Sequence, residues 1–254
     1  MEKLTVIIPT LNEAHNIGSL LEQIDFADEI IVIDSYSSDD TVAIAKKFKT
    51  TIIQRKFDNF SNQKNFAIDT AKNSWIFLID ADERVPEKLK EEVLGIINSD
   101  TKIDGFWIYR TNFFMGRKLR FSGIQKDKVL RLFRKESCRY NGKLVHEEIE
   151  TKGKTVFLKN RFDHYSFHNS VSYKNKLDKY ARLQSVEYDK KIKRVSFYHL
   201  IIKPAFRFFK HYIMGLGIFD GYPGLKYAYY QMHTVYLRYA YVKQLKKTNS
   251  LQSS

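Results

Sequence analysis

The first hundred residues alternate short apolar runs with longer segments in which apolar positions recur at helical spacing. Short apolar runs between polar residues predict buried strands, and the helical spacing predicts amphipathic helices. In chain order the pattern predicts strand 4–10, helix 13–24, strand 29–35, helix 38–48, strand 50–55, helix 61–72, strand 75–79 and helix 86–98. This alternation is typical of a mostly parallel sheet with helices on both faces, so the sequence predicts an α/β fold.

Polar residues at the predicted helix starts support these assignments. Asn12 is the expected N-cap of the first helix, and Ser38 is the expected cap of the second. Asp39 and Asp40 follow in the first turn of the second helix, where the helix dipole favours negative charge. Pro86 stands at the start of the fourth helix, the position that proline tolerates best.

The pattern changes after residue 100. Short strands are predicted at 105–110, 129–134, 146–151 and 155–159, with Asn-Gly at 141–142 and Lys-Gly at 152–153 as turn signals. From residue 170 onward the chain reads as helices at 171–193, at 195–216 with an interruption at Pro204, and at 225–247. We expect one domain over 1–165, a helical appendage over 166–247 and a frayed polar tail over 248–254.

Charge is unevenly distributed along the 254 residues, whose formal net charge is +14. Residues 171–254 hold 16 Lys and Arg against 4 Asp and Glu, together with 12 of the 16 tyrosines. Such a basic aromatic region suits an anionic partner, and amphipathic helices of this composition suit an anionic membrane surface. A helical layer with solvated lysines is the plain alternative, and nucleic acid is disfavoured because no motif that binds it is recognisable.

Other whole-chain features limit the compartment. The single cysteine, Cys138, excludes an internal disulfide framework and fits a reducing environment. The apolar run at 4–9 is too short for a signal peptide, and no run is long enough to span a bilayer. We therefore expect a cytosolic protein, or one bound to a membrane face without crossing it.

Carboxylates follow three of the predicted strands. Glu13 comes after the first strand, Asp34 ends the second, and Asp80-Ala81-Asp82 follows the apolar run 75–79. Ligands in open α/β sheets bind outside the carboxyl ends of the strands. Carboxylates gathered there would repel one another without a cation or hydrogen-bond donors between them. Strand spacing would point Asp80 and Asp82 to the same side, where they could hold a hard divalent cation and its phosphates; an acidic turn is the plain alternative.

Two common nucleotide motifs are absent from the sequence. No G-x-G-x-x-G follows the first strand, so a dinucleotide site is unsupported, and there is no G-x-x-x-x-G-K-[ST] phosphate loop. A nucleotide could still bind through carboxylate contacts to base and ribose, with a metal on its phosphates.

Several motifs together resemble the family 2 glycosyltransferases of GT-A fold. They are Val6-Ile7-Ile8-Pro9-Thr10-Leu11-Asn12-Glu13, Ile31-Val32-Ile33-Asp34-Ser35, Ser38-Asp39-Asp40-Thr41 and Asp80-Ala81-Asp82. Further segments resemble the subgroup that builds lipopolysaccharide cores, which includes β-1,4-glucosyltransferases acting on inner-core heptose. These segments are Gln63-Lys64-Asn65-Phe66-Ala67, Arg131-Leu132-Phe133-Arg134, Val145-His146-Glu147 and Gly215-Leu216-Gly217-Ile218-Phe219-Asp220-Gly221.

The resemblance implies roles for the matching residues. The GT-A domain would span 1–165, with a nucleotide half at 1–100 and an acceptor half at 101–165. The residues implied in binding the nucleotide sugar are Pro9, Asn12, Glu13, Asp34, Lys64, Asp80 and Asp82. Asp82 would ligate Mg²⁺ or Mn²⁺ at the diphosphate, with Asp80 on the ribose or the metal. Lys64 would lie near the donor, and a solvated helix lysine is its alternative.

Inversion at the anomeric carbon also needs a base that takes the proton of the acceptor hydroxyl. Glu147 is the first candidate because it matches the His-Glu motif of the subgroup, and Asp127 is the second. Glu147 could instead be an ordinary edge-strand carboxylate, and His146 reads more simply as a hydrogen-bonded structural histidine.

The sequence thus predicts an inverting, metal-dependent transferase that moves a hexose, expected to be glucose from UDP-glucose. The acceptor would be a lipid-linked oligosaccharide, the inner core of lipopolysaccharide, met at the cytoplasmic face of the inner membrane. The alternatives are a transferase of the same fold with another nucleotide sugar or a capsular acceptor, and a non-catalytic protein that binds a nucleotide sugar or a polyanion.

Overall fold

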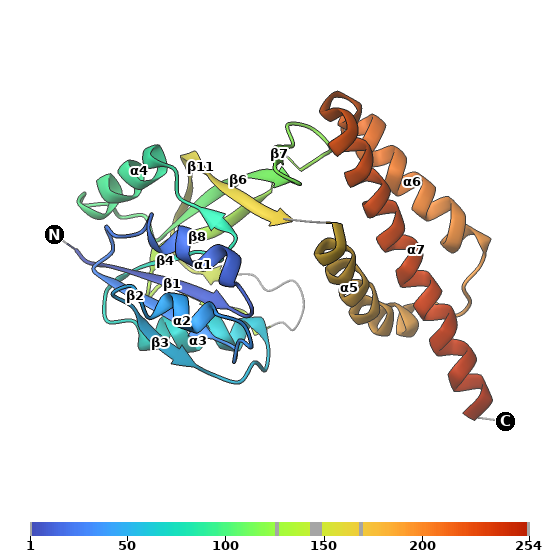
Figure 1. Cartoon of the computed structure of the whole chain (residues 1–254), viewed down its shortest axis with the longest axis horizontal. Coiled ribbons are helices and arrows are strands. Elements are labelled where there is room, and N and C mark those ends of the chain that lie inside the picture. Colours follow the sequence, from blue (N-terminus) through green and yellow to red (C-terminus); the bar gives the residue numbers. More distant parts are fainter. Residues whose placement is uncertain (1, 125–126, 143–148, 168–169, 253–254) are drawn as a thin grey trace. The chain divides into compact units, whose positions relative to one another are not determined.

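Two compact units make up the chain, and strands β6 and β11 each continue from one unit into the other (Figure 1). The computed structural model describes residues 2–124, 127–142, 149–167 and 170–252. The first unit comprises Met1–Arg110 and Asp127–His164, and the second comprises Thr111–Lys126 and Tyr165–Ser254.

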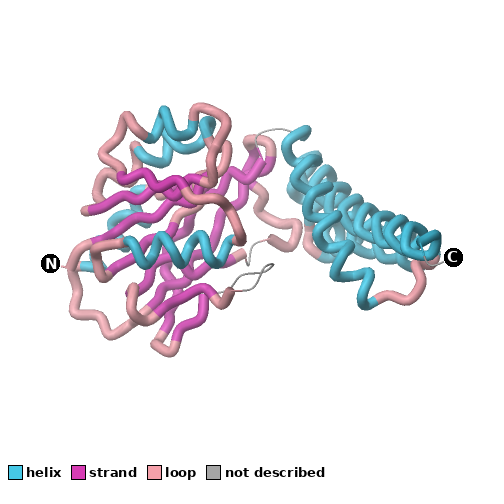
Figure 2. Tube along the Cα trace, turned by 90° about the horizontal axis from the view of Figure 1, so that it is seen from below, coloured by secondary structure: helices cyan, strands magenta, loops and turns pink. Residues whose placement is uncertain are grey.

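The sheet of the first unit, magenta in Figure 2, begins with four parallel strands in the order β3-β2-β1-β4. They are β1 (Leu4–Thr10), β2 (Glu29–Asp34), β3 (Thr51–Gln54) and β4 (Trp75–Leu78). All four residues of β4 are buried, as expected for a strand covered on both faces. The parallel α/β sheet predicted from the first hundred residues is confirmed.

The sheet continues beyond β4 with antiparallel strands, in the order β8-β6-β11-β5. These are β8 (Lys128–Arg134), β6 (Gly105–Phe114), β11 (Thr155–Phe167) and β5 (Glu83–Arg84), while β7 (Arg117–Lys118) pairs with β6. A separate ribbon pairs β9 (Cys138–Tyr140) with β10 (Ile149–Thr151). Strand β11 is much longer than the predicted strand 155–159, because its second half continues the sheet and pairs with β5.

Helices cover the two faces of this sheet, and alternation along the strands decides which side chains meet which helix. Leu4, Val6 and Ile8 of β1 lie in the cluster that contains the buried side chains of α1 (Ala14–Leu21) and α4 (Glu87–Ile97). Ile7 lies in the opposite cluster with α3 (Phe60–Thr70). The single cysteine, Cys138, is buried in that second cluster.

The first helix does not begin as predicted. Its N-cap is Glu13, which makes no side-chain cap bond, and Asn12 instead adopts a left-handed conformation with φ 57°. The Asn12 side-chain oxygen accepts from the backbone N–H of Ser38 at 2.8 Å. Asn12 therefore joins the loops after β1 and β2, a tertiary role that local capping preferences do not reveal.

The second helix is only Thr41–Ala45 (α2), shorter than the predicted 38–48. Asp39 lies before it and accepts from the backbone N–H of Ala14 at 3.1 Å, at the start of α1. Burial raises the pKa of Asp39, but hydrogen bonds from Thr41 and Ala14 outweigh this and leave its pKa below the usual value. Asp39, expected in the first turn of the second helix, thus lies before it and bonds to the first residues of both α2 and α1.

The second unit is largely helical. It contains α5 (Ser170–Lys191), a π-helical turn η1 (Tyr198–Ile202), α6 (Lys203–Phe209), a second π-helical turn η2 (Lys210–Met214), a 3₁₀ turn η3 (Gly217–Asp220) and α7 (Gly221–Gln252). Pro204 does not interrupt the helical course, since it lies in the first turn of α6. Helix α7 continues through residues 248–252, which we expected to fray.

Residues 111–124 group with these helices, although the sequence suggested a single boundary near 165. Phe114 packs edge-on against Tyr173, Tyr227 and Tyr230. The Asp220 carboxylate accepts from the backbone N–H groups of Arg120 at 2.8 Å and Phe121 at 3.0 Å. These contacts join segments about a hundred residues apart, so no local pattern could signal them.

The predicted break between the last two helices is replaced by a compact turn. Leu216 and Gly221 have positive φ values of 57° and 63°, which reverse the chain on each side of η3. A Cβ at Gly224 would lie 2.0 Å from the carbonyl oxygen of Gly217, so only glycine allows this close approach. The glycines therefore shape the turn, and the helix resumes directly at residue 221. Among the described residues, no helix is both long and apolar enough to cross a membrane.

Candidate active site

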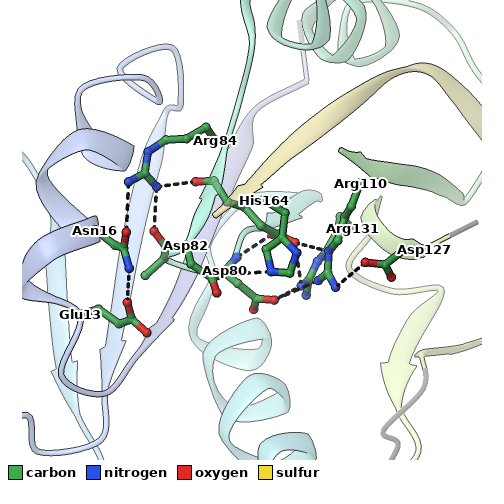
Figure 3. A network of polar contacts seen from close by, with 11 residues as sticks. Glu13, Asn16, Asp80, Asp82, Arg84, Arg110, Asp127, Arg131 and His164 are labelled. Atoms are coloured by element: carbon green, nitrogen blue, oxygen red, sulfur yellow. Dashed lines mark hydrogen bonds and ion pairs between the residues drawn. The ribbon is translucent and has the colours of Figure 1, made fainter. Parts of the chain in front are cut away.

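The predicted strand-end carboxylates lie at the carboxyl ends of β1, β2 and β4, in the first unit. Figure 3 shows Glu13, Asp80 and Asp82 with the residues around them. The parallel register places Thr10 beside Asp34, and Ile7 beside Leu78. The loops that follow these strands therefore begin at the same edge of the sheet, as the sequence argument required.

Asp80 faces two arginines from the antiparallel half of the sheet. Its Oδ2 accepts from Nη2 of Arg110 at 3.2 Å and makes a short ion pair with Nη2 of Arg131. Burial raises the pKa of Asp80, but the charges of Arg131, Lys64 and Arg110 outweigh this and hold its pKa well below the usual range. Asp80 is therefore ionised throughout the neutral pH range.

Glu83 completes this ion-pair cluster from inside the protein. Its side chain is fully buried, and its Oε1 accepts from Nε of Arg110 at 2.7 Å and from Nη2 of Arg131 at 3.3 Å. Glu83 also accepts from the backbone N–H of Asp80 at 2.8 Å, which fixes the start of the acidic segment. Each charge of the cluster therefore has an opposite partner, and the two guanidinium groups are held beside the acidic turn.

Asp82 faces a different partner, His164 of β11. Its Oδ1 lies 3.5 Å from Nε2 of His164, and 17% of the Asp82 side chain is accessible. Asp80 and Asp82 do not continue a strand, so the reason for expecting them to point to the same side does not hold. Strand β4 ends at Leu78, and the acidic residues lie in the turn before β5, so the side-chain alternation of a strand does not apply.

Glu13 is linked to this turn through a chain of hydrogen bonds. Its carboxylate accepts from Nδ2 of Asn16 at 2.7 Å, and Oδ1 of Asn16 accepts from Nη2 of Arg84 at 3.4 Å. Nη1 of Arg84 in turn donates to the carbonyl oxygen of Ala81 at 2.9 Å. The loop after β1 is thereby connected to the residue between the two aspartates (Figure 3).

Asp34 is fully buried, and its carboxylate is already well supplied with donors. The hydroxyls of Thr10 and Ser37, the backbone N–H of Ser37 and the side-chain amide of Gln54 all donate to it, at 2.5–3.2 Å. A carboxylate has about four acceptor positions, so these bonds occupy Asp34. In this conformation it orders the loop after β2, and a direct contact to a nucleotide base would replace one of these donors. Pro9 belongs to β1 itself, paired with Ile33.

Lys64 is buried, which rules out the solvated helix lysine considered as its alternative. Its Nζ lies over the ring of Tyr140, 4.9 Å from the centroid, and its charge helps to lower the pKa of Asp80. Lys64 therefore joins Arg110 and Arg131 as the third cation close to the acidic turn.

The two candidate bases have different outcomes. Asp127 lies beside the ion-pair cluster, with Oδ2 3.7 Å from Nη1 of Arg110, and 34% of its side chain is accessible. Glu147 and His146 lie outside the described residues.

A divalent metal fits one part of this site better than the rest. The described residues include no cluster of three or more His, Cys, Asp or Glu side chains placed to hold a metal ion. Mg²⁺ and Mn²⁺ at nucleotide sites commonly take only one or two protein ligands, because substrate phosphates and water supply the others. Asp82 and His164 fit that pattern, whereas the Asp80 carboxylate is engaged by arginines.

Sequence reasoning missed Arg110, Glu83 and His164 and gave Arg131 no role. Strand alternation could have indicated that the Glu83 side chain points into the protein. Glu83 lies in a strand of only two residues, which is too short to be recognised from an alternating pattern. Arg110 is the last residue of the predicted strand 105–110, and His164 lies five residues beyond the predicted strand 155–159. Both observed strands are longer than predicted, so the sequence pattern did not place these two side chains at the site.

Comparison with known proteins identifies the family. Residues 5–181 match the glycosyl transferase family 2, and this match covers more than half of the chain. The chain belongs to that family. The matched range contains the strand-end carboxylates, the ion-pair cluster and His164.

Curated relatives agree with this assignment. The chain is 30% identical over 183 residues to an uncharacterized glycosyltransferase of Rickettsia felis, covering 65% of this chain and 63% of the relative. It is 28% identical over 156 residues to the lipopolysaccharide core biosynthesis glycosyltransferase LpsC of Rhizobium meliloti, covering 59% and 58%. The chain thus spans less than two thirds of the length of these relatives.

Solved structures include a similar but distant protein. Glucosyl-3-phosphoglycerate synthase of Mycobacterium tuberculosis, solved with Mn²⁺, UDP and glucosyl-3-phosphoglycerate, is 21% identical, with a TM-score of 0.37 and 44% of each chain covered.

Proposed function

We propose that this protein is an inverting, metal-dependent glycosyltransferase that transfers a hexose, glucose from UDP-glucose, to the inner core of lipopolysaccharide. The observation that carries the proposal is the pair Asp82 and His164 beside the cations around Asp80, at one edge of the sheet. Family membership supports glycosyl transfer. The name of the R. meliloti relative supports a lipopolysaccharide core acceptor.

In this proposal, different residues bind the metal, the diphosphate and the nucleoside. Asp82 and His164 would hold Mg²⁺ or Mn²⁺, which when bound neutralises charge on the departing UDP. Arg110, Arg131 and Lys64 contribute fixed positive charge beside the diphosphate without further reorganisation. Asp80 keeps these cations in place. Glu13 and the loop at Asn12 line the nucleoside side, with Pro9 near the end of the preceding strand and Asp34 ordering the neighbouring loop after β2.

The donor half of the proposal predicts metal-dependent release of UDP. The purified chain should release UDP slowly from UDP-glucose in the presence of Mn²⁺, because water can replace the acceptor. A chelator should reduce this rate to background, and added Mn²⁺ should restore it. Coupled detection of UDP across a series of nucleotide sugars would also identify the preferred donor. Absence of turnover with every nucleotide sugar would contradict the enzymatic proposal.

The acceptor half assigns the base. We propose Glu147 as the group that takes the proton of the acceptor hydroxyl, with Asp127 as the second candidate. Glu147→Gln should lower the transfer rate by about 10²–10⁴-fold while leaving the affinity for UDP-glucose nearly unchanged. Asp127→Asn is the matched comparison, and a larger loss of transfer for Asp127→Asn would move the assignment to Asp127.

We also propose that the acceptor is lipid-linked and is met at the cytoplasmic face of the inner membrane. A core oligosaccharide is built on a lipid, so the enzyme and its acceptor would share that surface. Mass spectrometry of the core oligosaccharide from a deletion strain would name the missing sugar and its attachment, and an unchanged core would contradict this acceptor.

A further inference from the structure

The segment 197–222, in the second unit, exposes many apolar side chains to solvent. The large apolar residues exposed there are Phe197, Tyr198, Ile201, Ile202, Phe206, Phe209, Ile213, Met214, Leu216, Ile218, Phe219 and Tyr222. The structure describes this stretch in full, and Lys210 is the one charged residue among its exposed positions. We call these twelve side chains the apolar face.

Apart from Lys210, the basic side chains of the same segment are half-buried or buried. Lys203 is half-buried, and its Nζ donates to the hydroxyl of Tyr239 on α7 at 3.0 Å. Arg207 is also half-buried, and His211 is buried with a hydrogen bond to the carbonyl oxygen of Ser122. A helix on a water-exposed surface turns its charged residues outward and its apolar residues inward. This segment has the reverse distribution, which indicates that its outer side contacts something other than water.

Basic side chains border the apolar face along the chain. Exposed cations stand directly before it, at Lys190, Lys191, Lys193 and Arg194. Beyond its other end, Arg117 and Lys226 line a cavity of about 240 Å³ together with Met115, Tyr222 and Pro223. The apolar face therefore lies between two basic groups, in a region whose charge is strongly positive.

We propose that the apolar face inserts into the outer layer of an anionic phospholipid membrane, while the flanking basic residues contact lipid phosphates. An amphipathic segment with exposed aromatic residues and neighbouring lysines lies in the plane of a bilayer and buries its apolar side among the acyl chains. The proposed function adds only a reason for being at a membrane, since a lipid-linked acceptor would be found there. The docking face itself follows from burial and charge.

Charge favours a membrane over a second copy of the chain. Two copies could cover each other's apolar residues, but they would also bring together two regions with 16 Lys and Arg against 4 Asp and Glu. An anionic bilayer satisfies the apolar and the basic residues at once, because phosphates lie directly above its acyl chains.

Vesicle binding by the full chain tests this inference. The protein should co-sediment with vesicles of phosphatidylglycerol and phosphatidylcholine, and more weakly with phosphatidylcholine alone. Salt should weaken this binding without abolishing it, because screening reduces the electrostatic contribution and leaves apolar insertion. The double variant Ile201→Ser, Phe206→Ser should lower the partition coefficient by about a hundredfold, near tenfold for each buried side chain. Lys193→Glu with Arg194→Glu should weaken binding to the anionic vesicles only.

A matched control uses exposed apolar residues of α5 in the same unit. The double variant Leu183→Ser, Val186→Ser removes two comparable side chains, 55% and 57% exposed, and should change binding less than twofold. Circular dichroism and UDP release by each variant separate a lipid-binding defect from misfolding or a missing enzymatic activity. The inference would be overturned if the folded chain did not bind anionic vesicles at low salt. It would also be overturned if the chain formed a stable dimer that did not bind vesicles and that Phe206→Ser dissociated.

Discussion

Asp82→Ala is expected to lower metal-dependent UDP release from UDP-glucose by about a thousandfold, since a bound divalent cation contributes several kcal/mol to stabilising the leaving group. Asp82 lies in the acidic turn after β4, and its Oδ1 faces Nε2 of His164 at 3.5 Å. Removing it leaves the imidazole as the only proposed protein ligand. The rate should be measured across a range of Mn²⁺ concentrations.

Two comparisons distinguish loss of the metal from loss of structure. Mn²⁺ binding in the presence of UDP, followed by electron paramagnetic resonance, should be lost in Asp82→Ala, whereas the unfolding transition should move little. Asp100→Ala changes an exposed aspartate in the loop before β6 and should leave both measurements unaltered. Full metal-dependent turnover by Asp82→Ala would remove this residue from the site.

Arg131→Met is expected to lower the free energy of unfolding of the first unit by about 3–5 kcal/mol, because the buried Glu83 and the half-buried Asp80 would then share a single arginine, Arg110. Only 4% of the Arg131 side chain is accessible, and its guanidinium contacts both Asp80 and Glu83. Trp75 and Trp107 are the chain's two tryptophans and both belong to this unit, so urea unfolding can be followed by their fluorescence.

A surface ion pair provides the control for this prediction. Arg139 pairs with Asp69 at 2.8 Å, and both side chains are exposed, so Arg139→Met should cost less than about 1 kcal/mol. The double variant Arg131→Met, Asp80→Asn should recover part of the lost stability, because it removes the stranded charge together with its partner. An Arg131→Met protein as stable as the wild type would contradict the buried ion-pair cluster.

The same cluster sets an acid limit for the first unit. The pKa of Asp80 is lower in the folded chain than in the unfolded chain, so folding is favoured while Asp80 is ionised. This contribution is complete above the unfolded pKa of about 4 and is lost as the pH falls through the lower folded value. Arg131→Met should therefore show a smaller loss of stability below pH 4 than the wild type.

Part of the site could be read from local sequence because it depends on where buried strands end. The apolar runs of β1, β2 and β4 predicted a parallel sheet. The ends of these strands lie at one edge of that sheet, which predicted that Glu13, Asp34 and the acidic turn lie near one another. The motifs at these ends also indicated the family, which the match over residues 5–181 confirmed. The roles of these residues in binding donor and metal stay predictions.

The capping residues show where local reasoning failed. Asn12 was expected to cap the first helix, yet its side-chain oxygen accepts from Ser38 in the loop after β2. Asp39 was expected in the first turn of the second helix, yet it lies before that helix and accepts from the backbone N–H groups of both Thr41 and Ala14. An oxygen that accepts from an orphan N–H satisfies it equally well from either side, and only the packing of β1 beside β2 decides which helix it serves.

By itself, the sequence determined the α/β fold of the first hundred residues, the family, and the concentration of positive charge after residue 170. These properties follow from periodicity, composition and motifs, which are local. The tertiary structure decided that Arg110 and Arg131 form ion pairs with Asp80 and that His164 faces Asp82. It also decided that the segment 197–222 exposes its apolar side chains to solvent. These contacts join residues that are far apart in the sequence. The exposure of a helix also depends on which of its sides packs against a neighbouring helix.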